Sequence, residues 1–322
     1  MPSVDLVTVG SLFAEVTPVQ AGETLAEAHR YTLVAGGAAA NMVFALARLG
    51  VKVRFITAVG DDEFGELLAG DLAEFGVDTS CVRRVAGQLT TVTFCSVDRQ
   101  GGKVFRFYRF PGYCAPMQEL TAEDFRTVTD CRLFDFSEGS IREPALRPLV
   151  FDAARAARAA GVPVLYAVNL RRSSWGLPDE EIRKIECEAL ALADITVLNA
   201  EEAAFLGGEY AVDDLRRIQV LGPKVVVMTR GGDGDMSVSI GNVELSVPPY
   251  RVRVIYDVGA GDTFHAGLAA AMLRGDPLAM TEAEWAYALQ FAAAAAAIRV
   301  STSADPRDLP TAEQVERWMR RV

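Results

Sequence analysis

The feature that most constrains the fold of this chain is the alternation of short apolar runs with longer helical segments. Apolar runs at residues 130–136 and 162–168 flank a segment of helical character at about 143–160. Strand–helix–strand alternation of this kind is typical of βαβ units, because parallel strands need a crossover connection. Other predicted strands lie at residues 5–9, 51–60, 195–198 and 224–228. We therefore predict an α/β fold with ligands at the carboxyl edge of a parallel sheet.

A glycine-rich turn late in the chain separates an extended segment at residues 250–256 from a predicted buried helix at 264–274. The turn consists of Gly259, Ala260 and Gly261, followed by Asp262. Its backbone N–H groups are expected to lie unpaired at the positive end of the helix, where small residues let an anion approach. A carboxylate is repelled by bound negative charge, but a general base for a hydroxyl that attacks a phosphate needs this position. The alternative is that Asp262 only caps the helix.

Composition and charge disfavour several classes of partner and predict a compartment. The 322 residues carry a net charge of −11, from 43 acidic and 32 basic residues, which disfavours binding to nucleic acid or an anionic membrane. Five scattered cysteines without a C-x-x-C pair, and only two histidines, argue against a disulfide framework or a transition-metal site. The chain start lacks signal-peptide features, and the alanine-rich run at 291–298 is too short to span a bilayer. We predict a cytoplasmic protein.

Polar residues that follow predicted strands are candidates for substrate contacts. Glu15 comes after the strand at 5–9, and Asn169 and Arg171 come directly after the strand at 162–168. Ligands lie at the carboxyl edge of a parallel sheet, so these side chains can meet a substrate there. For Glu15 the alternative is a solvated surface charge.

A β-hairpin is predicted at residues 91–109, where two arms rich in aromatic and β-branched residues flank a turn with two glycines. The apolar side chains on both arms indicate that the hairpin covers another part of the molecule. Arg109, at its end, is a candidate either for a substrate contact or for a surface salt bridge.

Two predicted helices follow in the first quarter of the chain. Gly36 and Gly37 precede a small-residue helix near Asn41 and allow another segment of backbone to come close. The next helix begins at residues 61–65 and carries apolar residues at helical spacing, all predicted to be core. They are Phe64, Leu67, Leu68, Leu72 and Phe75.

Two polar segments after later strands each have a structural and a functional interpretation. Asn199 can cap the helix that follows the strand at 195–198, and Glu202 lies three residues further on. The loop that contains Thr229, Gly231 and Gly234 can be an ordinary glycine-rich hairpin loop. The residues alone leave both interpretations open.

The order and spacing of these motifs resemble the ribokinase-like (PfkB-type) carbohydrate kinase family, over residues 5–310. The shared motifs are the Gly-Gly pair followed by Asn41, N-x-x-E at 199–202, T-x-G-x-x-G at 229–234 and Gly-Ala-Gly-Asp at 259–262. The resemblance implies one three-layer α/β domain over residues 1–322, with a mainly parallel central sheet. It also implies a small β-sheet lid over the sugar, from about residues 12–34 and 90–112.

The activity that the resemblance implies is ATP-dependent phosphorylation of a sugar hydroxyl. Asp262 would be the catalytic base, and the turn at Gly259, Ala260 and Gly261 would hold the developing charge. Sugar contacts are implied for Glu15, Gly36, Gly37, Asn41, Arg109, Asn169 and Arg171. Contacts with the nucleotide are implied for Asn199, Thr229, Gly231 and Gly234. Glu202, together with Asn199, would organise Mg²⁺ and its waters.

The chain departs from the family pattern at several positions. Glu15 and Ala167 each stand where an Asp is common, and Ala293 replaces a frequent Asn. Asp257 is shifted by one residue from an acid that many family members have, with Tyr256 in its place. This shift argues against a binding site for a monovalent cation near the turn.

The substrate and the assembly are narrower inferences from the same resemblance. Residues 107–112, 139–144 and 169–175 look most like fructokinases. Arg109 and Glu15 also suit kinases of 2-keto-3-deoxygluconate, where an arginine meets the carboxylate, and nucleoside kinases come third. The alternative of another class is a catalytically inactive sugar- or nucleotide-binding regulatory protein. The resemblance further implies a homodimer formed through the lid.

Overall fold

The computed structural model describes residues 2–20, 23–97, 103–108, 115–232, 234–256, 258–303 and 307–321, without the side chains of residues 97, 103, 107 and 108. The strands are β1 (Val4–Val9), β2 (Phe13–Pro18), β3 (Tyr31–Gly36), β4 (Val53–Gly60), β5 (Val82–Val85), β6 (Val92–Val97), β7 (Lys103–Tyr108), β8 (Cys131–Ser137), β9 (Val164–Ala167), β10 (Ile195–Asn199), β11 (Val225–Thr229), β12 (Met236–Ile240) and β13 (Val243–Val247). The α-helices are α1 (Ala38–Arg48), α2 (Glu63–Glu74), α3 (Glu138–Ile141), α4 (Arg147–Ala159), α5 (Asp179–Leu192), α6 (Ala200–Gly207), α7 (Arg216–Gln219), α8 (Ala260–Met272), α9 (Glu282–Thr302) and α10 (Ala312–Met319).

The central sheet has the strand order β13-β12-β11-β10-β9-β8-β1-β4-β5. Every neighbouring pair from β5 across to β11 is parallel, and the β11–β12 and β12–β13 pairs are antiparallel. β1, with the sequence VDLVTV, is buried along nearly its whole length, as expected for a parallel strand that has helices on both faces. The predicted α/β fold with a mainly parallel sheet is confirmed.

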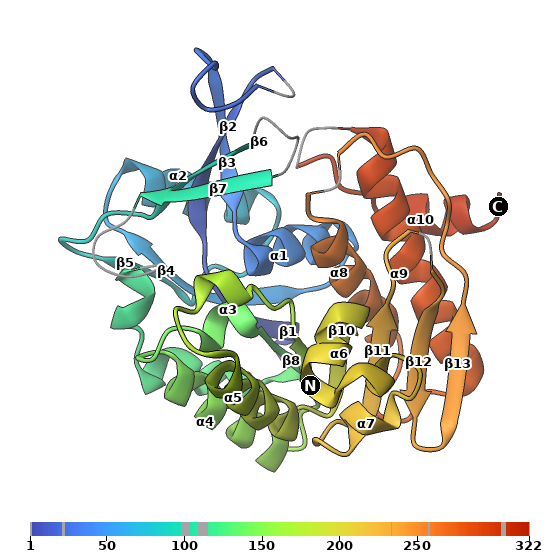
Figure 1. Ribbon diagram of the computed structural model, residues 1–322. Coiled ribbons are helices and arrows are strands. Elements are labelled where there is room, and N and C mark those ends of the chain that lie inside the picture. The colour runs from blue at the N-terminus through green and yellow to red at the C-terminus, as the bar shows by residue number, and fades with distance from the viewer. Residues whose placement is uncertain are drawn as a thin grey trace.

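Helices cover both faces of this sheet, which gives three layers (Figure 1). One core contains residues of α1, α2, α8, α9 and α10, and the other contains residues of α3 to α7. α8 and α9 approach closely: a Cβ on Gly267 would lie 2.8 Å from the Ala292 Cα, so only glycine fits there. Although α9 has 21 residues, neither it nor any other helix of the described chain is long and apolar enough to cross a membrane.

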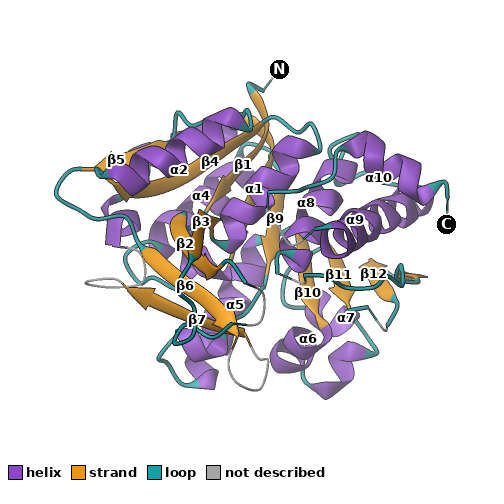
Figure 2. Cartoon of the chain, turned by 90° about the horizontal axis from the view of Figure 1, so that it is seen from above, coloured by secondary structure: helices purple, strands orange, loops and turns teal. Residues whose placement is uncertain are grey.

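A second, smaller sheet has the strand order β3-β2-β6-β7. The β2–β3 and β6–β7 pairs are antiparallel and the β2–β6 pair is parallel, so two hairpins lie side by side. The predicted hairpin at 91–109 is confirmed over its described residues. Figure 2, a view from above, shows this small sheet in front of α1, apart from the strands of the central sheet.

One local prediction is wrong, namely the assignment of every apolar residue of α2 to the core. Phe64 and Leu67 are 39% and 45% exposed, whereas Leu68 and Leu72 are fully buried. α2 contacts β4, β2 and β3, and its buried residues, Gly65, Leu68 and Leu72, lie in a single row along the helix. Residues 250–256, predicted as extended, pair with no strand in the described part of the chain, and the amides of Ile255 and Tyr256 both donate to the Val300 carbonyl at the end of α9.

Candidate active site

The glycine-rich turn forms the N-terminus of α8. Gly259 has φ 81° and ψ 5°, a left-handed conformation that glycine adopts without strain. Its carbonyl accepts the first intrahelical bond, from the Thr263 amide at 2.8 Å. The amides of Ala260, Gly261 and Asp262 therefore have no acceptor within the helix, and they lie at the positive end of its dipole. Nothing lies within 4 Å of a Cβ placed on Gly261, which leaves the turn open to a ligand.

Asp262 does not cap the helix. It is the third helical residue, and its Oδ2 accepts a hydrogen bond of 2.8 Å from Nδ2 of Asn41 on α1. The carboxylate keeps some exposed surface, yet burial still raises the pKa of Asp262. The bond from Asn41 opposes this rise, as do electrostatic interactions with Arg171 and His265. The carboxylate is thus fixed beside the turn, as a general base requires.

Glu15 of β2 lies close to this pair. It is 8% exposed, and burial raises its pKa to about 7, with a further contribution from the negative charge of Asp262. A Cβ on Gly36 would lie 2.8 Å from the Glu15 Cβ, and a Cβ on Gly37 would lie 2.4 Å from the Ser11 carbonyl oxygen. The two glycines therefore let the β3–α1 junction approach the chain around Ser11 and Glu15. Glu15, Gly36, Gly37 and Asn41 are brought together as predicted.

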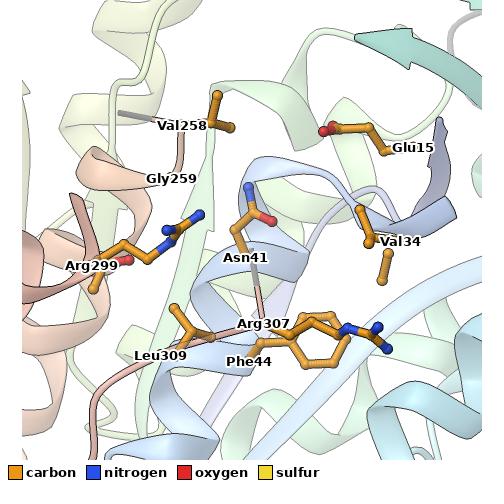
Figure 3. A pocket seen from close by; sticks show the side chains of 11 residues that line it. Glu15, Val34, Asn41, Phe44, Val258, Gly259, Arg299, Arg307 and Leu309 are labelled. Atoms are coloured by element: carbon orange, nitrogen blue, oxygen red, sulfur yellow. The ribbon is translucent and has the colours of Figure 1, made fainter. Parts of the chain in front are cut away.

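Two cavities flank the bond between Asn41 and Asp262. One cavity is lined by Glu15, Asn41, Gly259 and Arg299, with Arg299 on the side of Gly259 and Glu15 on the opposite side (Figure 3). A second cavity is lined by Asp262 and by Asn169 from the loop after β9. A ligand in either cavity would therefore reach one member of the pair.

The buried carboxylate of Glu202 fixes the loop after β9 through a hydrogen bond to its backbone. The Leu170 amide donates to Oε1 of Glu202 at 2.7 Å. Asn169, just before it, has φ 39°, the one described residue other than glycine with positive φ. Such a conformation costs free energy and is found where surrounding contacts impose it, often at functional sites. Arg171 is exposed, and its charge acts on both Asp262 and Glu202.

Asn199 and Glu202 cap α6 reciprocally, so the capping interpretation is correct. The Asn199 side chain accepts from the Glu202 amide at 2.9 Å, and Oε2 of Glu202 accepts from the Asn199 amide at 2.8 Å. With the bond from Leu170, each carboxylate oxygen already accepts a backbone N–H. Burial raises the pKa of Glu202, and these two backbone bonds oppose the rise. No group of three or more His, Cys, Asp and Glu side chains suited to a metal occurs in the described part of the chain.

The predicted nucleotide residues lie at the same sheet edge. Thr229 ends β11 directly beside Asn199, its partner in the ladder with β10. Gly231 has φ 69°. A Cβ on Gly234 would lie 2.6 Å from the Arg230 Cβ, so the loop is too tight for a larger residue. Neither of the two cavities is lined by these residues.

Two predicted positions fall on undescribed residues, and two buried residues were not predicted. Arg109 and Asp257 lie outside the described residues, so the arginine contact and the question of a monovalent cation stay predictions. Asp135 on β8 and His265 on α8 line the cavity with Asp262. Both left a signal in the sequence: Asp135 is an isolated acid in an apolar run, and His265 follows Asp262 by one helical turn.

We expect Glu15→Gln to stabilise the protein at alkaline pH but not in acid. Folding raises the pKa of Glu15 from 4.5 to about 7, so the folded protein binds this proton more tightly than the unfolded chain. The stabilisation that protonated Glu15 contributes to the fold is complete below about pH 4.5 and is lost as the pH rises through 7. The total loss is about 3 kcal/mol, because each pKa unit corresponds to ~1.36 kcal/mol. Glutamine does not ionise and therefore has no such loss. The free energy of unfolding of the variant should rise relative to that of the wild type over this pH range.

Urea unfolding at several pH values between 4 and 8 measures this difference. Glu244→Gln, at an exposed position on β13, is the matched control and should show no comparable trend. A difference between Glu15→Gln and the wild type that stays constant with pH would contradict the assignment.

Comparisons with known proteins find carbohydrate kinases among the relatives and structural neighbours of this chain. A family model described as pfkB family carbohydrate kinase matches residues 4–312. "Probable fructokinase-6, chloroplastic" from Arabidopsis thaliana is 32% identical over 316 residues, 96% of this chain and 81% of the relative. A solved fructokinase with bound ATP from Xylella fastidiosa is 25% identical, with a TM-score of 0.86 over 98% of each chain. An aminoimidazole riboside kinase from Salmonella enterica, complexed with aminoimidazole riboside and an ATP analogue, is 27% identical, with a TM-score of 0.82 over 98% of this chain and 99% of that one.

Proposed function

The chain belongs to the pfkB family of carbohydrate kinases, and we propose that it transfers a phosphoryl group from ATP to a hydroxyl of fructose. The observation that carries the proposal is the Asp262 carboxylate, held by Asn41 at 2.8 Å beside the open amides of the α8 N-terminus. A base and an anion site side by side are what phosphoryl transfer to a hydroxyl requires. Fructose is favoured because the Arabidopsis relative and the Xylella structure are both named as fructokinases.

In the proposed reaction, Asp262 takes the proton of the acceptor hydroxyl as its oxygen attacks the phosphoryl group. Burial makes this carboxylate a stronger base, while the hydrogen bond from Asn41 and electrostatic interactions with Arg171 and His265 keep it from being too easily protonated. The amides of Ala260, Gly261 and Asp262 donate to the negative charge that develops on the transferred group. Gly259 supplies the left-handed turn that points these amides outward.

The nucleotide is proposed to lie along the edge formed by Asn199, Thr229, Gly231 and Gly234. Mg²⁺, when bound, would neutralise charge on the phosphates. Mg²⁺ usually keeps several of its waters, and Glu202 already accepts two backbone N–H groups. Glu202 therefore fits a contact through water rather than a place in a set of direct ligands.

The sugar is proposed to lie between α1, the turn and the loop after β9. Glu15, Asn41, Asn169 and Arg171 would contact its hydroxyls, and Gly36 and Gly37 would let it approach the backbone. The small sheet would act as a lid, formed within a single domain by residues 12–34 and 90–112. Excluding water matters for a kinase, because water competes as a phosphoryl acceptor.

The proposed assembly is a homodimer formed through the lid. The proposed location is the cytoplasm. β3 and β7 are the edge strands of the small sheet, and each carries an exposed aromatic side chain. Tyr31 and Phe105 are both 40% exposed. Unpaired strand edges of this kind can pair with a second chain.

The test is release of ADP from ATP and Mg²⁺ in the presence of fructose, 2-keto-3-deoxygluconate, ribose, other hexoses and nucleosides. We expect fructose to give the highest kcat/KM. A preference for the keto acid would retain the mechanism and replace the substrate. Tight ATP binding without turnover on any acceptor would favour a regulatory binding protein instead.

A further inference from the structure

Three buried polar residues lie beneath the proposed base. Thr8 on β1 and Asp135 on β8 are partners in the parallel ladder, and the Thr8 hydroxyl donates to Oδ2 of Asp135 at 2.7 Å. His265 lies on α8, one turn after Asp262. Thr8, Asp135 and His265 are 0%, 2% and 6% exposed. Because Thr8 fixes one carboxylate oxygen, the other, Oδ1, is directed away from the strand partner.

Asp135 and His265 are close but do not complete each other's hydrogen bonding. Oδ1 of Asp135 lies 2.9 Å from Nε2 of His265, within the range of an ion pair. The two atoms nevertheless form no hydrogen bond with each other, and both lack a hydrogen-bond partner in the described part of the chain. Buried polar atoms in this condition are rare, because leaving them unsatisfied costs free energy. The pair is therefore arranged for a third group.

The cavity above the pair indicates what this group is. Asp135 and His265 line it together with Asp262, Asn169, Ser137 and Ala167. The proposed base and a proposed substrate contact therefore face the same space. Ala167 contributes only a methyl group, so Asp135, His265 and Ser137 supply the polar atoms on the floor of the cavity.

We propose that Asp135 and His265 form a hydroxyl-binding subsite for the acceptor sugar. A hydroxyl both donates and accepts, so one hydroxyl can donate to Oδ1 of Asp135 and accept from Nε2–H of His265. The group bound is a second hydroxyl of the sugar, distinct from the one that Asp262 deprotonates. This inference rests on the proposed function, and it makes the pair determinants of which sugar is accepted.

The test combines one variant with fructose analogues that each lack one hydroxyl. His265→Phe removes the ring nitrogens and keeps an aromatic ring. For the wild type, we expect one analogue to lose about 10- to 100-fold in kcat/KM, because the missing hydroxyl leaves the buried atoms of Asp135 and His265 unpaired. His265→Phe should lose a similar factor on fructose, mainly through KM, with an unchanged KM for ATP. With that analogue, kcat/KM of His265→Phe should be no lower than kcat/KM of the same variant with fructose.

Tyr166→Phe is the matched control. The Tyr166 hydroxyl donates to Oε2 of Glu186 at 2.6 Å, and both residues are fully buried, but neither lines this cavity. The control removes a buried hydrogen bond beside a carboxylate, and we expect its discrimination among the analogues to match the wild type. If His265→Phe does not fold, Asp135→Asn keeps the size of the side chain and an acceptor for Thr8, and it should show the same loss of discrimination.

The outcomes separate this proposal from the one it rests on. If the wild type phosphorylates fructose, but His265→Phe or Asp135→Asn retains the full discrimination against every analogue, the subsite is overturned and the kinase assignment stands. The pair would then bind water or serve only the fold. If the wild type phosphorylates no sugar, the proposed function is overturned, and the subsite with it.

Discussion

We expect Asp262→Asn to lower turnover by about 10²- to 10⁴-fold, the usual contribution of a general base. Asparagine has the same shape and retains an oxygen that can accept the bond from Asn41, but it cannot take a proton from a hydroxyl. The fold should be unaffected, because burial disfavours the charge on Asp262 and the substitution removes this charge. Steady-state ADP release at saturating sugar and ATP measures the loss, and circular dichroism checks the fold.

Asp152→Asn is the control for this substitution. Asp152 is an exposed residue of α4 that pairs with Arg155 on the same helix, and its replacement should leave turnover unchanged. Near-normal turnover of Asp262→Asn would remove Asp262 from the mechanism. An equal loss in both variants would point to general damage rather than to a missing base.

The second large effect is expected from Gly37→Ala, which should destabilise the protein by about 3 kcal/mol or more. Gly37 has φ 117°, and a Cβ there would lie 2.4 Å from the backbone oxygen of Ser11, which cannot move as a side chain can. Relief of this contact would push the β3–α1 junction away from β2. Asn41 and Glu15 would then separate, so KM for the sugar should rise as well.

Gly50→Ala isolates the conformational part of this loss. Gly50 follows α1 with φ 86°, but nothing lies within 4 Å of an added Cβ. Its replacement should cost only about 1 kcal/mol, the strain of a left-handed alanine. Urea unfolding of both variants gives the comparison, and equal losses would show that the close contact with Ser11 does not constrain Gly37.

Local features of the fold were predictable because they depend on neighbouring residues. The apolar runs identified β1, β8, β9, β10 and β11, and the Gly259–Gly261 turn identified the start of α8. Helix capping was one of two interpretations that the sequence left open for Asn199, and the structure shows the cap. The order of the strands could not be predicted in the same way, because it depends on contacts between segments far apart in the chain. The β12–β13 hairpin was also missed.

The site shows the same division. Asp262 and Asn41 were each predicted from local motifs, but their mutual hydrogen bond joins residues 221 positions apart. The capping role of Glu202 follows from its spacing to Asn199, whereas its bond to the Leu170 amide depends on how α6 lies against the loop after β9. Phe64 and Leu67 were assigned to the core because helical periodicity does not tell how wide a helix face the neighbouring sheet covers.

The central claim is that the phosphoryl group goes to a sugar hydroxyl and not to water. Phosphorus NMR of the wild-type protein with ATP, Mg²⁺ and fructose tests it most directly. The account predicts a sugar phosphate monoester that grows in step with ADP, and little inorganic phosphate. ADP accompanied by inorganic phosphate, or no ADP at all, would contradict it.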